Sequence, residues 1–256
     1  MLWSPASNEE FAKWKSNIDG TDLVPGQSKP SVEHILCRAI MSEDYDLVRS
    51  CISKGARLNE WVHGSIWRTN KALELFQILV PAGLGVNHNF DTIGGYVAAT
   101  ACHNQMELTR CLLEHGADPN RNPVIGLYPA LNMAVKESHA DMAEMLIKYG
   151  AKVDGLGASA MAAQYRRFEM MELLFRHGAD VNDDARDRVE VCIDFVERTT
   201  ALHRAAEAGH VDVVVYLIER GANPDLNDED GRTPSGAAVE NGRPEVAEVL
   251  NNLQRG

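Results

Sequence analysis

The stretch TTALHRAAEAGHVDVVVYLIERGANPDLNDEDGRTP, residues 199–234, decides the fold. It opens with small residues at 201–206, continues with apolar residues at helical spacing from Val211 to Ile218, and reaches a glycine at Gly221. The apolar spacing predicts an amphipathic helix. The glycine suits a left-handed position just after a helix, where a Cβ carries a steric cost. The stretch therefore predicts a short helix, a second helix and a turn.

The glycine phrase at the end of this stretch recurs along the chain. Its copies are KGARLN at 54–59, HGADPN at 115–120, YGAKVD at 149–154, HGADVN at 177–182 and RGANPD at 220–225, with a weaker AGLGVN at 82–87. Successive phrase glycines, from Gly55 to Gly221, are 28, 33, 34, 28 and 43 residues apart. The period is near 33 with one insertion, and we predict about seven units.

Residues 199–234 resemble the ankyrin repeat almost position by position, and the resemblance covers roughly residues 31–253. It implies an all-α solenoid of helix-turn-helix units with β-turn fingers, curved around a concave groove. His203 stands at the histidine of the family's TPLH segment, where the ring ties adjacent turns together. The copy at 62–87 is degenerate, with Trp67 and Arg68 where the family usually has alanines.

The N-terminal segment, residues 1–30, does not match the repeat. Phe11, Trp14 and Ile18 lie at i, i+3 and i+7 and predict one apolar face on a short helix. We expect this helix and arm either to cap the first repeat or to fold over the groove.

The long step before Gly221 places an enlarged finger at residues 183–197. Apolar and polar residues alternate there from Val189 to Phe195, which is a strand period. The finger is expected to pack against its neighbours or to contact a partner. We assign residues 31–256 to the repeat domain, which ends in a polar C-terminal cap containing Asn251 and Asn252.

Composition narrows the functional classes. The chain has 256 residues and a formal charge of −12, which disfavours nucleic-acid binding and favours a basic partner. Its five cysteines follow no disulfide or zinc spacing, and no apolar run is long enough to span a membrane. The sequence predicts a monomeric intracellular protein, cytoplasmic or nuclear, that does not bind membranes.

A search for catalytic and cofactor motifs finds no nucleophile elbow, metal-binding HExxH, P-loop or paired CxxC. Cys102 and His103 are adjacent, but we interpret them as groove-lining residues. The sequence predicts no metal, no cofactor and no catalytic residue, and it favours a role other than enzyme.

The groove is the remaining candidate site. In ankyrin proteins, variable contact residues follow the small-residue pair of each inner helix, and nearby turns add to them. The candidates here are Trp67, Arg68, Tyr96, His103, Tyr128, Lys136, Glu137, Tyr165, Arg166, Glu207 and Glu240. They are mixed and partly aromatic in the earlier units and acidic in the last two. Tryptophans of the degenerate repeat, Trp61 and Trp67, are either anchors for a partner or core residues.

Two functions follow from these residues. The first is a binding module that recognises a protein or peptide, with basic character facing Glu207 and Glu240. The alternative is a small-molecule-binding protein or atypical enzyme with a pocket among the aromatic residues of repeats 2–5.

Overall fold

The computed structural model describes residues 31–66, 69, 71–90, 94–121, 128–185 and 198–253. The expectations for residues 1–30, for Trp67 and Arg68, and for most of the enlarged finger lie outside the described residues. The chain divides into two compact units, Met1–His88 (unit 1) and Asn89–Gly256 (unit 2).

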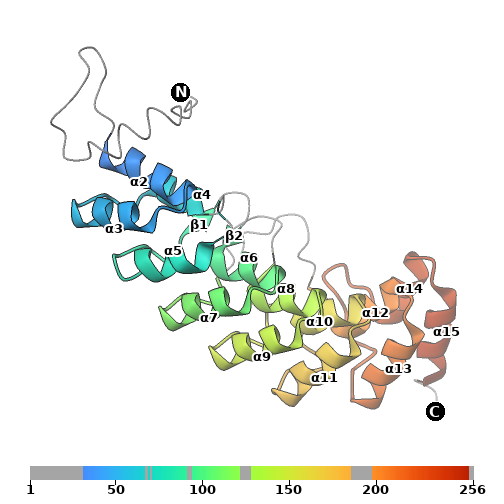
Figure 1. Cartoon of the computed structure of the whole chain (residues 1–256). Coiled ribbons are helices and arrows are strands. Elements are labelled where there is room, and N and C mark those ends of the chain that lie inside the picture. Colours follow the sequence, from blue (N-terminus) through green and yellow to red (C-terminus); the bar gives the residue numbers. More distant parts are fainter. Residues whose placement is uncertain are drawn as a thin grey trace. The chain divides into compact units, whose positions relative to one another are not determined.

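Among the described residues, fourteen helices follow one another in seven pairs, and they confirm the all-α prediction (Figure 1). Unit 1 contains α2 (Val32–Met41), α3 (Tyr45–Ser53), α4 (Glu60–Ile66) and α5 (Ala72–Leu79). Unit 2 contains α6 (Tyr96–Cys102), α7 (Met106–Glu114), α8 (Ala130–Lys136), α9 (Ala140–Lys148), α10 (Ala158–Gln164), α11 (Phe168–Arg176), α12 (Ala201–Ala208), α13 (Val211–Glu219), α14 (Pro234–Glu240) and α15 (Pro244–Leu253).

One feature of the fold was not predicted. A two-residue strand, β1 (Asn89–Phe90), pairs antiparallel with β2 (Gly94–Gly95) directly before α6. The pairing places Asn89 opposite Gly95. Such a short ladder is a finger between helices and not a separate sheet layer.

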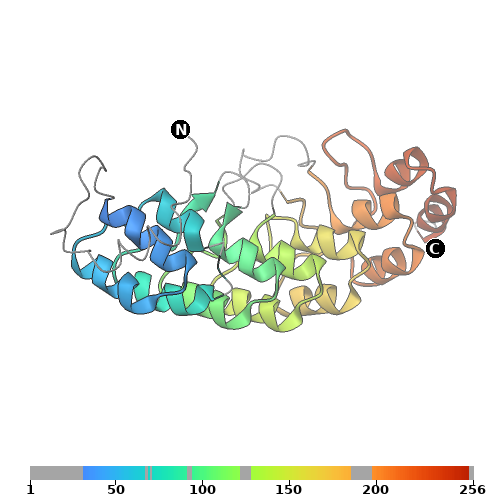
Figure 2. The same ribbon diagram turned by 45° about the horizontal axis from the view of Figure 1, so that its top comes forward.

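Within unit 2, the helices form an inner and an outer row (Figure 2). The inner helices α6, α8, α10, α12 and α14 pack successively on one another, and each outer helix packs against the inner helix that precedes it. Small side chains make the close inner packing possible, since Ala162, Ala163, Ala205 and Ala206 are completely buried. Small residues at these positions therefore let neighbouring inner helices approach closely.

Left-handed backbone positions end the helices, as the glycine phrase predicts. Gly221, after α13, has φ of +87°, and Gly178, after α11, has φ of +89°. A second such position joins each inner helix to its outer helix. It holds Gly209 after α12 but Arg166, with φ of +54°, after α10. Glycine is therefore preferred but not required at this junction.

The core of unit 1 forms where α2 packs against α3 and α4. His63 on α4 is only 4% exposed, and its ring stacks on His88 with centroids 3.8 Å apart. Ser65 and Ile66 follow His63 at the spacing of Ala205 and Ala206 after His203, and both are buried. The small-residue pair of this degenerate repeat therefore falls at Ser65 and Ile66, two positions before the place assigned from sequence.

No helix within the described ranges is both long and apolar enough to cross a membrane.

Burial of His63 predicts that unit 1 loses stability in mild acid. Burial, followed by repulsion from His88, lowers the pKa of His63 from 6.5 to about 4. Unfolding restores the ordinary pKa, so the contribution of neutral His63 is complete above pH 6.5 and declines as the pH falls toward 4. The difference corresponds to about 3 kcal/mol. Urea unfolding followed by tryptophan fluorescence measures it, because all four tryptophans lie in unit 1.

A matched pair of variants tests this assignment. His63→Gln should flatten the dependence of the unfolding free energy on pH between 7.5 and 5, and His34→Gln, at an exposed histidine of the same unit, should leave it unchanged. The same slope in wild type and His63→Gln would contradict the assignment.

Candidate functional site

In two repeats of unit 2, a buried polar side chain connects the inner helix to the following finger. On α12, His203 Nε2 donates a hydrogen bond of 2.9 Å to the carbonyl of Arg232, and its Nδ1 lies 2.8 Å from the hydroxyl of Thr200. Burial lowers the pKa of His203, which favours the neutral ring. At the corresponding position of α8, Asn132 Nδ2 donates to the carbonyl of Leu156 at 2.8 Å. These bonds confirm the structural role implied for His203.

A second set of contacts closes the C-terminal ends of the inner helices. The residue before each of α11, α13 and α15 reaches back to a carbonyl at the end of a preceding inner helix. Arg167 Nε donates to Lys136 O (3.1 Å), His210 Nε2 to Gln164 O (3.0 Å) and Arg243 Nε to Glu207 O (3.4 Å). Helix ends leave such carbonyls without intrahelical partners. The contacts therefore hold successive helix ends in a row.

Most of the predicted groove residues of unit 2 lie along these ends. We call the helix-end row the set His103, Lys136, Glu137, Tyr165, Arg166, Glu207 and Glu240, which lie at or beside the C-terminal ends of α6, α8, α10, α12 and α14. His103, Glu137, Tyr165, Arg166 and Glu240 are exposed, and Lys136 and Glu207 are half-buried. The row is a surface of mixed charge with one tyrosine, and its last two residues are acidic.

The middle of the helix-end row is aromatic and cationic. Tyr165 is 38% exposed, and Lys136 Nζ lies 5.7 Å from the centre of its ring, within reach of a cation–π contact. Lys136 also pairs with Glu137 at 3.8 Å. Next to Tyr165, Arg166 Nη2 contacts Asp212 Oδ2 at 2.6 Å. These contacts partly order long side chains that would otherwise move freely.

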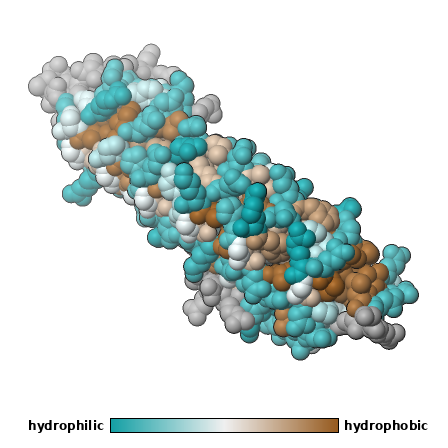
Figure 3. All heavy atoms as spheres, turned by 90° about the horizontal axis from the view of Figure 1, so that it is seen from below, coloured by the Kyte–Doolittle hydropathy of each residue, from teal (hydrophilic) through white to brown (hydrophobic). Residues whose placement is uncertain are grey.

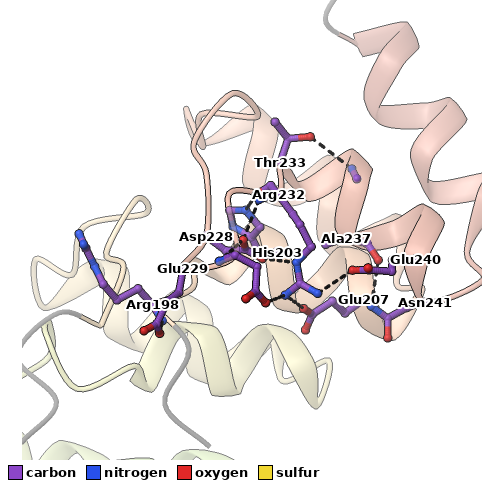
Figure 4. Close-up of polar contacts among 12 residues, drawn as sticks. Arg198, His203, Glu207, Asp228, Glu229, Arg232, Thr233, Ala237, Glu240 and Asn241 are labelled. Carbon is purple, nitrogen blue, oxygen red and sulfur yellow. Dashed lines mark hydrogen bonds and ion pairs between the residues drawn. The ribbon is translucent and has the colours of Figure 1, made fainter. Parts of the chain in front are cut away.

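Arg232 organises the acidic end of the row (Figure 4). Its guanidinium contacts Asp228 Oδ2 at 2.8 Å, Asp230 Oδ2 at 3.1 Å, Glu240 Oε2 at 2.7 Å and Glu207 Oε1 at 3.7 Å. Asp228 is almost fully buried and also accepts a hydrogen bond from the backbone N–H of Arg232 at 2.8 Å. The buried carboxylate of Asp228 thus fixes the position of Arg232 among the more exposed carboxylates.

The two glutamates predicted to form an acidic surface are therefore paired within the chain. Glu207 is contacted by Arg204 at 2.9 Å as well as by Arg232, and its side chain is only 14% exposed. Glu240 remains 63% exposed. Four carboxylates share the Arg232 guanidinium, so an excess of negative charge stays at this end.

The other predicted site residues do not join the row. Tyr96 on α6 is completely buried, and burial raises the pKa of its hydroxyl, so it is a core residue and not part of a surface. The sequence did not reveal that Tyr96 is buried, because an aromatic residue at the start of a small-residue helix was interpreted as part of an exposed turn. Tyr128 lies half-buried before α8, and Trp67 and Arg68 lie outside the described residues.

Cys102 and His103 do not form an activated nucleophile. Cys102 is half-buried, and burial, followed by the charge of Glu137, raises the pKa of its thiol. A raised pKa favours the unreactive thiol over the thiolate.

Sequence reasoning missed Arg232 and Asp228. Their local signal is a spacing of four residues within DEDGRTP, which places both in one finger. The contacts of Arg232 with Glu207 and Glu240 join three separate parts of the chain, so only the folded structure shows the cluster.

Comparison of the chain with known proteins identifies its family. A family model described as ankyrin repeats (3 copies) matches residues 36–156 and 159–254, and the chain therefore belongs to the ankyrin repeat family. Family membership, together with the first relative below, supports a protein-binding module with protein partners.

Three similar proteins illustrate the range of relatives. Cyclin-dependent kinase 4 inhibitor B of Bos taurus is 31% identical over 154 residues, which cover 60% of this chain and 88% of that protein. E3 ubiquitin-protein ligase hecd-1 of Caenorhabditis elegans is 35% identical over 100 residues, 39% of this chain and 3% of that protein. Putative palmitoyltransferase ZDHHC13 of Danio rerio is 26% identical over 226 residues, 84% of this chain and 32% of that protein. The chain thus spans only a small part of the two larger relatives.

Removing the Arg232 side chain should destabilise unit 2. Arg232→Gln leaves the buried Asp228 carboxylate without its ion pair, which we expect to cost about 2 kcal/mol, below the usual range because Arg232 is partly exposed. Urea unfolding followed by circular dichroism measures the loss. Arg176→Gln, which breaks an exposed pair with Glu144, is the control and should cost less than about 1 kcal/mol. Equal losses in the two variants would contradict the central role of Arg232.

Proposed function

We propose that this chain binds a protein partner along the helix-end row of unit 2. The observation that carries the proposal is the exposed ring of Tyr165, flanked by Lys136 and Arg166, in the middle of a row whose helix ends are fixed by backbone contacts. Tyrosine and arginine supply much of the energy of typical interfaces. A rigid row loses little conformational entropy when a partner binds.

The charge of the row indicates which partner would fit. Near Arg232 the exposed carboxylates of Asp230 and Glu240 exceed the available positive charge. A partner segment with a lysine or arginine could pair with them while another side chain packs on Tyr165. We therefore propose a protein or peptide with basic character at the α14 end of the row.

The similar kinase inhibitor suggests a first candidate. The name Cyclin-dependent kinase 4 inhibitor B refers to inhibition of a kinase, and this chain covers most of that protein. Cyclin-dependent kinase 4 is therefore the first purified protein to test as a partner. The small-molecule alternative has no comparable support, since Tyr96 lies in the core and Tyr165 on the surface.

A photo-crosslinking residue tests the proposed surface. A chain with such a residue at position 165 should crosslink to its partner, and a chain with it at Lys148, exposed on the outer helix α9, should not. With the purified partner, Tyr165→Ala and Glu240→Lys should each weaken binding about tenfold or more, because the first removes the aromatic contact and the second reverses the charge that pairs with a basic partner residue. Lys148→Ala is the matched control. Unchanged affinity of Tyr165→Ala would exclude the helix-end row.

A further inference from the structure

An asparagine in the finger after α7 is bonded in two ways to the next finger. Asn120 Nδ2 donates to the carbonyl of Gly150 at 2.9 Å, and Asn120 Oδ1 accepts from the backbone N–H of Lys152 at 2.7 Å. Gly150 is the glycine of the next glycine phrase, and Lys152 lies two positions after it. An amide side chain carries both a donor and an acceptor, so it can make the two bonds at once.

The finger after α11 repeats this arrangement. Asn182 Nδ2 donates to the carbonyl of Gly221 at 3.4 Å, and Asn182 Oδ1 accepts from the backbone N–H of Asn223 at 2.8 Å. Gly221 and Asn223 are again the phrase glycine and the residue two positions after it. Two of the finger junctions in unit 2 are therefore built alike.

The junction between these two carries an aspartate instead. Asp154, half-buried in the finger after α9, accepts from the backbone N–H of Asp180 at 2.9 Å, which is the bond that Asn120 and Asn182 accept at their junctions. By this correspondence, the second bond would run to the carbonyl of Gly178. An ionised carboxylate has no proton to donate. The junction therefore lacks this second bond whenever Asp154 is ionised.

Negative charge gathers at the Asp154 junction. Asp183 Oδ1 accepts from the backbone N–H of Gly155 at 2.9 Å, which brings a second carboxylate beside Asp154. Asp183 Oδ2 is buried and has no hydrogen-bond partner among the described residues. The other charged groups in the described parts of the adjoining fingers are Asp118 and Arg121 before Asp154, Lys152 beside it, and Asp180, Asp184 and Arg198 after it, the last two paired with each other.

Burial and like charge both favour a proton at this junction. Burial raises the pKa of Asp154, and the charge of Asp180 adds to this against the hydrogen bond from the Asp180 N–H. Burial also raises the pKa of Asp183, and the charge of Asp154 adds to it. A carboxyl group with a raised pKa in the fold stabilises the protein fully below its ordinary pKa, 3.8 for aspartate, and this stability is lost as the pH rises through the folded value.

Polar contacts between the outer helices across the same junction are weak. Arg176 of α11 pairs with Glu144 of α9 at 2.9 Å, but the two side chains are 62% and 53% exposed. Figure 3 shows the side of the molecule on which the outer helices of unit 2 lie, where hydrophilic side chains cover much of the surface. Ion pairs on such a hydrated surface contribute little. The strength of this junction therefore depends on helix packing and on the finger contacts.

We propose that the Asp154 junction is a proton-dependent contact within the repeat array. At neutral pH, ionised Asp154 makes one of the two bonds that each asparagine makes, so this is the weakest of the three finger junctions. A proton taken up from solvent lets the Asp154 side chain donate to the carbonyl of Gly178 and removes its repulsion of Asp183. Mild acid therefore strengthens this junction in unit 2. The inference concerns the array itself and does not depend on the function proposed for the helix-end row.

Asp154→Asn is the main test, because it supplies the missing donor in a side chain of the same shape. At pH 7.5 it should lower the equilibrium constant for unfolding of the full chain about fivefold, the usual effect of one hydrogen bond. Urea unfolding followed by circular dichroism measures it. The gain should shrink as the pH falls from 7.5 toward 4, because the wild type then takes up its own proton. Comparison with wild type at each pH cancels the contribution of His63.

Asp180→Asn is the matched control for charge. It removes a like charge beside Asp154 and keeps a side-chain oxygen for the N–H of Asn182, but it brings no donor to Gly178. It should change the unfolding constant less than about twofold. The converse variant, Asn182→Asp, removes a donor from a complete junction. It should raise the unfolding constant about fivefold at pH 7.5, and this loss should shrink in acid.

Nuclear magnetic resonance of the ¹³C-labelled full chain reports on the bond itself. The Asp154 carboxyl should titrate above the ordinary value of 3.8, and the carbonyl resonance of Gly178 should shift with the same midpoint, whereas those of Gly150 and Gly221 should not. Three results would overturn the proposal: no gain from Asp154→Asn at pH 7.5, equal gains from Asp154→Asn and Asp180→Asn, or a Gly178 carbonyl that does not follow the titration of Asp154.

Discussion

Close packing of successive inner helices is the constraint on which unit 2 depends, and on α8 and α12 a hydrogen bond from a buried side chain to the backbone of the following finger reinforces it. A repeat of two short helices buries too little surface to be stable alone, so each repeat needs the neighbouring repeat. His203 on α12 and Asn132 on α8 provide that connection through different chemistry but with the same geometry. Histidine or asparagine can therefore occupy this position, because each donates a hydrogen bond to a carbonyl of the following finger.

Close packing of the inner helices determines which residues remain for function. Alanines at positions such as 205 and 206 are completely buried, so the chain must place its variable residues just beyond them, at the helix ends. The outer helices obey a different rule, because only one side of each faces the core. Long side chains connect them instead, as when Arg176 reaches Glu144 and Arg220 reaches Glu172.

The acidic end of the helix-end row shows how charge becomes organised by folding. Counting residues predicts a negative surface at Glu207 and Glu240, but Arg232 lies between them and is itself held by the buried Asp228. Burying Asp228 without a partner would be costly. Arg232 therefore stabilises the fold by pairing with the buried Asp228. The surface remains negative because four carboxylates share this arginine.

The sequence by itself determined the helix pairs, their turns and the family, because glycine phrases and small-residue segments are local signals that recur at a fixed period. The resemblance to the ankyrin repeat also implied the structural role of His203. Only the tertiary structure decided that Tyr96 is buried while Tyr165 is exposed, since both are single aromatic residues near inner helices. It likewise decided the pairing of Glu207 and Glu240 with Arg232 and the meeting of Phe168 with Tyr216. These contacts join residues from different repeats, and a periodic pattern read along the chain contains no information about which side chains meet across it.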